Sequence, residues 1–253
     1  MVEGLDFSNS TDLDRRDIAT SLVPYWDEHL VLFFPKLRLS PADHVGFASC
    51  FGSRLAATTE VGSDYRDAPT MAAEGHPEIL VLDSRTKNFD ARATAVWHTD
   101  VTFVETPPKA SLFVMEIPAT RGGDTMWSNQ IRAHDALSEP IRRLIGDLSA
   151  VHGRPPLTGT ATHPMTRLHH SSGETALFVN RGWTARIEGL SNVESTKLLE
   201  AIFTIAERPD LQIRWRWTEG DVALWDNRYT MHYAVNDYSG QHRRARRVTI
   251  YDE

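Results

Sequence analysis

Hydrophobic positions recur with two different periods along the chain, which predicts a fold that mixes helices with many strands. Between residues 192 and 207 the apolar positions recur every three or four residues, as on a helix with one buried face. Residues 211–217 alternate apolar and polar, which predicts a strand that buries its odd-numbered side chains, Ile213 among them. Helices are predicted over residues 12–29, 40–51, 130–147 and 192–207. Strands are predicted over residues 30–34, 79–82, 94–104, 110–116, 175–180, 211–217, 221–226 and 246–251.

The order of these elements favours a mainly β fold with helices, namely a jelly-roll (double-stranded β-helix) core with helical decoration. The sequence has no repeats and no Pro/Gly/Ser-rich linker, so we expect one domain over residues 1–253. Long loops are predicted at 53–77 and 152–165, and Cys50 is expected to be buried in the helix over 40–51.

Charge and composition narrow the class of protein. With 27 basic and 34 acidic residues the net charge is −7, which argues against a general nucleic-acid binder. The longest apolar run, residues 30–34, is far too short to cross a membrane, and acidic residues 1–6 do not resemble a signal peptide. A single cysteine fits a reducing compartment, so we expect a cytoplasmic protein.

One short motif suggests a metal site. His98 and Asp100 are two residues apart within the predicted strand 94–104, so both side chains would project to the same face. An imidazole and a carboxylate on one face are two of the three ligands of a facial triad. The pair alone is weak support, because the chain contains 11 histidines and 34 acidic residues.

The C-terminal segment adds a third candidate ligand and two cations. His232 alone would ordinarily be interpreted as a structural histidine, and the run 243–247 as a solvated basic patch. On a strand, however, Arg243 and Arg247 share one face while Arg244 and Arg246 point away. Two arginines directed inward require anionic partners, because an unpaired buried charge is costly.

Four ordered segments resemble signatures of the taurine dioxygenase family of Fe(II)/2-oxoglutarate oxygenases. They are residues 97–108, 122–127, 180–184 and 225–233. The arginines 11 and 15 residues after His232 also match the spacing of the family. The resemblance extends from about residue 5 to residue 253, and it implies that jelly-roll fold.

The resemblance also implies roles for individual residues. His98, Asp100 and His232 would be the iron ligands. Thr125 would contact a carboxylate of 2-oxoglutarate, and Arg243 would form the salt bridge to its distal carboxylate. Arg247 would lie near the anionic group of the primary substrate, although the two arginines could exchange these ligands. The implied activity uses Fe(II), 2-oxoglutarate and O2 to hydroxylate a small anionic organic substrate, releasing succinate and CO2. Family members commonly self-associate, so a homo-oligomer is possible.

The substrate is left open by departures from the taurine-using members. The loop after Phe51 and Gly52 has no His-x-x-Tyr, and the matching positions fall near Asp67 and Thr70. Thr94 stands where those members have an asparagine. The segment 152–165 is also shorter than in many relatives, so a sulfonate, a sulfate ester, an aryloxyalkanoate and an amino-acid-like compound all remain candidates.

Two readings from other classes also remain open. Mixed His/Asp ligation would suit a zinc-dependent hydrolase, but that reading does not explain Arg243 and Arg247. The second alternative is a noncatalytic jelly-roll binding module, although the intact set of three candidate metal ligands argues against it. His169, His170 and His242 have no partner at a defensible metal-ligand spacing and are interpreted as structural.

Overall fold

Seven strands form one antiparallel sheet in the computed structural model, which describes the chain except residues 6, 8–10, 58–68, 87–94, 154–158 and 253. These strands are β1 (Val31–Phe34), β2 (Arg54–Ala56), β3 (Thr70–Met71), β4 (His76–Asp83), β5 (Ala110–Ile117), β13 (Val222–Asp226) and β15 (Arg244–Tyr251). β15 lies inside the sheet, where it pairs with β4, β5 and β2. A strand with so many partners is held in a fixed register.

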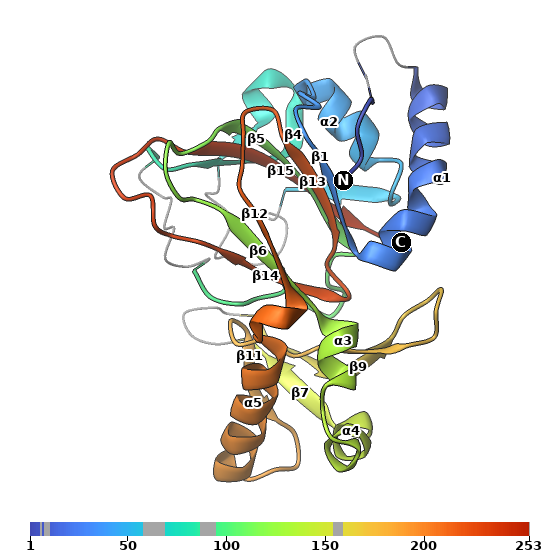
Figure 1. Cartoon of the computed structure of the whole chain (residues 1–253), viewed down its shortest axis with the longest axis vertical. Helices are drawn as coiled ribbons and strands as arrows, with labels where there is room; N and C mark the ends of the chain where they lie inside the picture. Colours follow the sequence, from blue (N-terminus) through green and yellow to red (C-terminus); the bar gives the residue numbers. More distant parts are fainter. Residues whose placement is uncertain (6, 8–10, 58–68, 87–94, 154–158, 253) are drawn as a thin grey trace.

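A second, three-stranded antiparallel sheet faces the first. Its strands are β6 (Thr125–Asn129), β12 (Gln212–Trp215) and β14 (Thr230–Ala234), with β6 in the middle. Between the two sheets lies a mainly aromatic cluster that includes Phe33, Phe113, Trp127, Trp217 and Trp225. Two facing antiparallel sheets with helices outside them form a jelly roll (Figure 1), so the predicted fold class is confirmed.

Two N-terminal helices, α1 (Asp12–His29) and α2 (Pro41–Ala48), cover the other face of the large sheet (Figure 1). The Thr11 hydroxyl and the Asp14 carboxylate form a capping box at the start of α1. Ser40 caps α2, and Pro41 occupies its first position, as expected. Because α2 ends at Ala48, Cys50 lies beyond the helix and is half-buried, contrary to the prediction.

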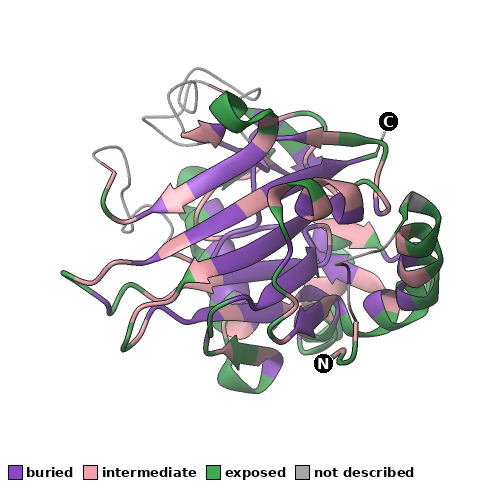
Figure 2. Ribbon diagram, turned by 90° about the horizontal axis from the view of Figure 1, so that it is seen from above, coloured by how far each residue is buried: buried purple, intermediate pink, exposed green. Residues whose placement is uncertain are grey.

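The remaining elements pack around an apolar cluster of their own, built on Leu199, Ile202 and Phe203. They are α3 (Gln130–Asp135), α4 (Glu139–Gly146), β7 (Ser149–His152), β8 (Ala161–Pro164), β9 (Thr166–Leu168), β10 (Thr175–Leu177), β11 (Thr184–Ile187) and α5 (Asn192–Ala206). The short 3-10 helices are η3 (Ala72–Glu74) and η4 (Pro209–Leu211). Figure 2 shows that the buried residues follow the strands, whereas the outer faces of the helices are exposed.

Several predicted elements differ from the structure. The helix predicted over 130–147 is two helices: α3 ends at Asp135, and α4 begins after Ser138, with a proline in its first turn. The expected loops contain β2, β3 and η3 in 53–77 and β8 in 152–165, and the strand predicted over 175–180 ends at Leu177. Ile213 is 48% exposed, because β12 is an edge strand of the small sheet. No described helix is long and apolar enough to cross a membrane.

Candidate active site

His98 and His232 are joined by a two-residue β-bridge, although 134 positions separate them in the sequence. The backbone N–H of His98 donates to the carbonyl of His232 at 3.0 Å, and the reverse bond measures 2.7 Å. Their ring centroids are 4.1 Å apart. The middle of β14 is thereby joined to the segment that carries His98, and the two imidazoles lie side by side.

Both imidazoles direct Nε2 toward one carboxylate. The Nδ1 atom of His98 lies 2.8 Å from the carbonyl of Val96, which fits an Nδ1–H donor and leaves Nε2 unprotonated. Nε2 of His98 is 3.8 Å from Oδ1 of Asp100, and Nε2 of His232 is 3.7 Å from that atom. These three ligand atoms all lie within 4.8 Å of one another.

Asp100 is held by a turn rather than by the strand predicted over 94–104. Among the described residues of that segment only His98 makes a β-bridge, and turns follow it. Val101 has φ 56°, a left-handed conformation that β-branched residues rarely adopt. The Asn227 side chain accepts from the backbone N–H of Asp100 at 2.8 Å and donates to its carbonyl at 3.0 Å. His98 and Asp100 converge as predicted, but through this clamped turn and not through strand periodicity.

The protonation states of the three residues suit a metal cation. Burial lowers the pKa of His98, and burial followed by the neighbouring His98 ring lowers the pKa of His232 to about 3. Burial acts to raise the pKa of Asp100, but Arg247 and the two imidazoles outweigh it and hold the pKa at about 2. At neutral pH the site therefore offers two neutral nitrogen donors and one carboxylate. That donor set, confined to one side of the ion, fits the facial triad of a non-haem Fe(II) centre.

A pocket beside the triad gathers the other predicted site residues. It is lined by His98, His232, Thr125, Arg243 and Arg247, together with Leu82, Phe113, Trp127, Trp217, Trp225, Ala234 and Tyr238. Trp217, one of the odd-numbered side chains predicted to be buried in residues 211–217, donates its indole N–H to the Thr125 hydroxyl at 2.9 Å. The wall is thus largely aromatic, with two guanidinium groups among apolar side chains.

The two arginines of the pocket have different partners. Arg247 donates from Nη1 to both oxygens of Asp100, whereas Arg243 is only 6% exposed and donates from Nε to the carbonyl of Gly123. Within the part of the chain that the structure describes, no carboxylate forms an ion pair with Arg243. Arg244 and Arg246 both pair with Glu116, so the predicted alternation of the run is correct.

Gly123 provides the space that the Arg243 side chain occupies. Its φ of 72° lies in the left-handed region, and an added Cβ would stand 3.1 Å from Cδ of Arg243. Its backbone N–H also donates to Asp237 at 2.7 Å. Gly123 is therefore explained by the placement of a buried cation, whereas an added Cβ on Gly122 would collide with Oδ1 of Asp237.

Three positioning residues were not singled out from the sequence, although two lie in its matched motifs. Asn227 is fully buried and clamps Asp100, and Ser111 donates to Oδ2 of Asp100 at 3.1 Å. Gly182 donates to the carbonyl of Trp97, and a Cβ on it would stand 2.9 Å from Cβ of His98. Their motif membership was a usable signal for Asn227 and Gly182, but nothing in the sequence marks Ser111.

Other sequence observations have mixed outcomes. Asp67 and Thr94 lie outside the described residues, and Thr70 begins β3. His242 lies 3.1 Å from Asp83 and belongs to neither group of candidate metal ligands found among the described residues. The prediction that His169 and His170 lack such partners is wrong, because the fold brings Asp27 beside them.

Comparison with known proteins gives consistent matches over nearly the whole chain. The family model described as "Taurine catabolism dioxygenase TauD, TfdA family" matches residues 2–249. An alpha-ketoglutarate-dependent sulfate ester dioxygenase of Pseudomonas putida is 34% identical, over 96% of this chain and 84% of the relative. An alkylsulfatase of Acinetobacter baylyi is 35% identical, over 89% of this chain and 74% of the relative. The crystal structure of a taurine dioxygenase from Burkholderia xenovorans aligns with TM-score 0.80 and 31% identity, covering 99% of this chain and 87% of that one.

Proposed function

The chain belongs to the TauD/TfdA family of dioxygenases, and on that basis we infer an Fe(II)- and 2-oxoglutarate-dependent dioxygenase that oxidises a small anionic organic substrate. The observation that carries this inference is the buried triad beside an arginine with no carboxylate partner in the described chain. A zinc-dependent hydrolase would leave the buried guanidinium of Arg243 unexplained. A cytoplasmic location and a homo-oligomer remain predictions from sequence.

We propose that His98, Asp100 and His232 hold the iron. The two bridged backbones fix the spacing of the imidazoles, and the Asn227 clamp fixes the carboxylate. When bound, the iron would supply O2 activation coupled to the oxidative decarboxylation of 2-oxoglutarate. Ser111 and Arg247 both contact the Asp100 carboxylate, so they would keep its second oxygen occupied and its orientation constant.

Arg243 and Thr125 are the proposed 2-oxoglutarate ligands. A buried guanidinium is costly unless an anion pairs with it, and the planar fork of arginine suits a carboxylate. The Nε–H of Arg243 is already directed to Gly123, so the bound carboxylate would use the terminal N–H groups. The Thr125 hydroxyl accepts from Trp217, which leaves its own proton to donate to a carboxylate of 2-oxoglutarate.

Arg247 is the proposed contact for the anionic head of the primary substrate. It lines the same pocket and is bonded to Asp100, so an anion at Arg247 would lie close to the metal. The aromatic side chains around it would exclude water and hold an apolar substrate chain. The carbon next to the anionic group would then be the one oxidised.

A sulfate ester is the substrate class that we favour, because two relatives with 34% and 35% identity are a sulfate ester dioxygenase and an alkylsulfatase. One oxygen atom of O2 would hydroxylate the carbon that bears the ester oxygen. The other atom enters succinate as 2-oxoglutarate loses CO2. The hydroxylated carbon then breaks its C–O bond, and an aldehyde, inorganic sulfate and a proton are released.

The test is to incubate the enzyme anaerobically with Fe(II) and 2-oxoglutarate, add air, and measure succinate and sulfate with hexyl sulfate, taurine or an aryloxyalkanoate. We expect equimolar sulfate and succinate from hexyl sulfate. His98→Ala should abolish turnover with its circular dichroism unchanged, while His76→Ala, outside the pocket, should retain it. Unchanged turnover in His98→Ala would refute the triad. Coupled succinate release only with taurine or the aryloxyalkanoate would refute the sulfate ester assignment.

A further inference from the structure

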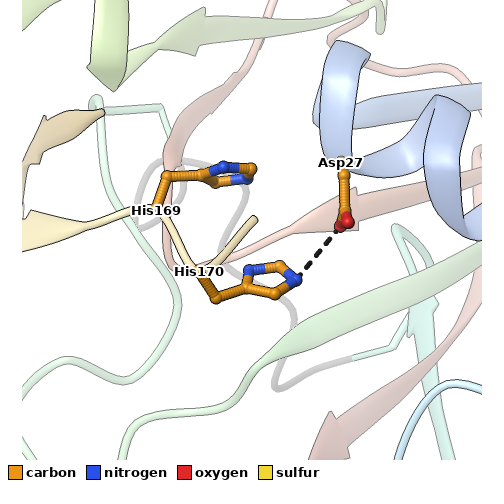
Figure 3. Close-up of side chains that lie close together, drawn as sticks. All are labelled: Asp27, His169 and His170. Atoms are coloured by element: carbon orange, nitrogen blue, oxygen red, sulfur yellow. Dashed lines mark ion pairs between the residues drawn. The ribbon is translucent and has the colours of Figure 1, made fainter. Parts of the chain in front are cut away.

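A second group of metal-ligating side chains lies away from the pocket, where the last turn of α1 meets the turn between β9 and β10. Asp27 comes from the helix, and His169 and His170 come from the turn. Figure 3 shows the three side chains converging on one small space. One ligand atom from each lies within 4.8 Å of the others.

His169 is the buried member of this group. Its side chain belongs to a residue only 2% exposed, yet its Nε2 has no hydrogen-bond partner. Nδ1 lies 3.0 Å from the hydroxyl of Ser172 and also accepts from the backbone N–H of Ser172 at 3.3 Å, so the proton of the neutral ring is on Nε2. A metal ion bound at Nε2 would displace that proton. A buried, unpartnered imidazole nitrogen is costly unless a ligand uses it.

Asp27 and His170 complete the donor set and open it to solvent. Oδ1 of Asp27 is buried without a hydrogen-bond donor, and it lies 3.3 Å from Nε2 of His170. The His170 side chain is 47% exposed, which provides a route of entry for an ion. The Tyr229 ring packs against both imidazoles, with centroids 4.5 Å from His169 and 6.2 Å from His170, and so limits their movement.

We propose that Asp27, His169 and His170 bind a divalent zinc ion, separate from the iron triad, with water as the fourth ligand. Two imidazoles and one carboxylate suit zinc, and ligands at its bond lengths of about 2.0–2.1 Å lie about 3.3 Å apart in a tetrahedral site. The His170–Asp27 pair already has that spacing. The ion would join α1 to the β9–β10 turn, two segments about 140 residues apart, and so stabilise the fold without taking part in the reaction.

The experiment removes the triad first, so that zinc at the other site is measured alone. In the full-length His98→Ala/His232→Ala background, Zn²⁺ would be titrated against a chromophoric chelator. We expect one equivalent bound and a higher melting temperature. Asp27→Asn and His170→Ala should each weaken binding by more than about tenfold, because losing a direct ligand costs at least as much as losing an outer-shell partner. His76→Ala should change nothing.

No zinc bound by the background protein, or equal affinity in Asp27→Asn, would overturn the proposal and leave only a His170–Asp27 ion pair. Asp27→Asn keeps the shape of the side chain, so it decides the matter if His170→Ala fails to fold by circular dichroism. The result does not depend on the dioxygenase reaction, because no turnover is measured.

Discussion

The guanidinium of Arg247 is bonded to both carboxylate oxygens of Asp100, at 2.9 and 3.1 Å from one nitrogen. The cation proposed for the substrate and the carboxylate proposed for the metal are therefore one connected unit. Both are largely buried, with side chains 12% and 6% exposed, so the attraction between them is weakly screened by water. A change at Arg247 should consequently reach the metal as well as the substrate.

Replacing Arg247 with Gln should weaken Fe(II) binding by about 10- to 100-fold, the range for outer-shell partners. Because Arg247 lowers the pKa of Asp100, its loss should raise that pKa, so protons would compete with the metal more strongly as pH falls. Anaerobic Fe(II) affinity at pH 6 and pH 7.5 measures this, with Arg244→Gln as control. Equal affinity of wild type and Arg247→Gln at both pH values would limit Arg247 to the substrate.

Arg243→Gln should raise the KM for 2-oxoglutarate by at least about 30-fold, because losing one partner of a buried charged pair costs about 2–5 kcal/mol. Steady-state kinetics at saturating primary substrate would separate KM from kcat. Arg243→Lys, which keeps the charge but loses the fork, should recover part of the affinity. An unchanged KM in Arg243→Gln would contradict the proposed role.

Gly123→Ala should raise the 2-oxoglutarate KM through its contact with Arg243. Gly240 is the matched control, because its φ of 77° is similar but no atom lies within 4 Å of an added Cβ. Both alanine variants should lose roughly 1–2 kcal/mol of unfolding free energy from the left-handed backbone. Only Gly123→Ala should alter the KM, and an equal rise in both variants would show that strain alone is responsible.

His44 should make the fold sensitive to mild acid. Burial, with the positive charge of Arg246, lowers the pKa of His44 from 6.5 to about 3. Between pH 6.5 and 3 His44 binds a proton in the unfolded chain but not in the folded one. The free energy of unfolding is therefore at its full value above pH 6.5 and falls as pH decreases toward 3. At pH 5.5 this group should cost about 1.4 kcal/mol of stability relative to pH 7.5. Urea unfolding of His44→Gln should show a correspondingly smaller loss, and an identical loss would exclude His44.

Sequence periodicity correctly predicted the elements whose conformation does not depend on contacts with distant residues. α1, α5, β5, β13 and β15 lie close to the predicted ranges. The ordered motifs also brought His98, Asp100, His232, Thr125, Arg243 and Arg247 to consideration together, and the structure gathers them around one pocket.

What the sequence missed depends on contacts between distant residues. The turn at Asp100 is set by Asn227, 127 positions away, and by the left-handed Val101, whose residue type favours a strand. Ile213 follows strand alternation but lies at a sheet edge, a position that only the pairing order reveals. Asp27 and His169 meet only because α1 packs near the β9–β10 turn. Such relationships have no local signature.

The four arginines around Ala245 would place one pair on each face of β15 in either of two pairing registers. A slip of one residue would exchange the pocket-facing arginines for the pair that contacts Glu116. It would also move Val248 and Ile250 away from the apolar cluster that they form with α1 and α2, onto the face of β15 that carries Ala245. The burial of those two aliphatic side chains therefore selects which cations reach the reaction site. In this chain, the packing of the apolar end of β15 determines which face of the sheet each arginine of its basic half occupies.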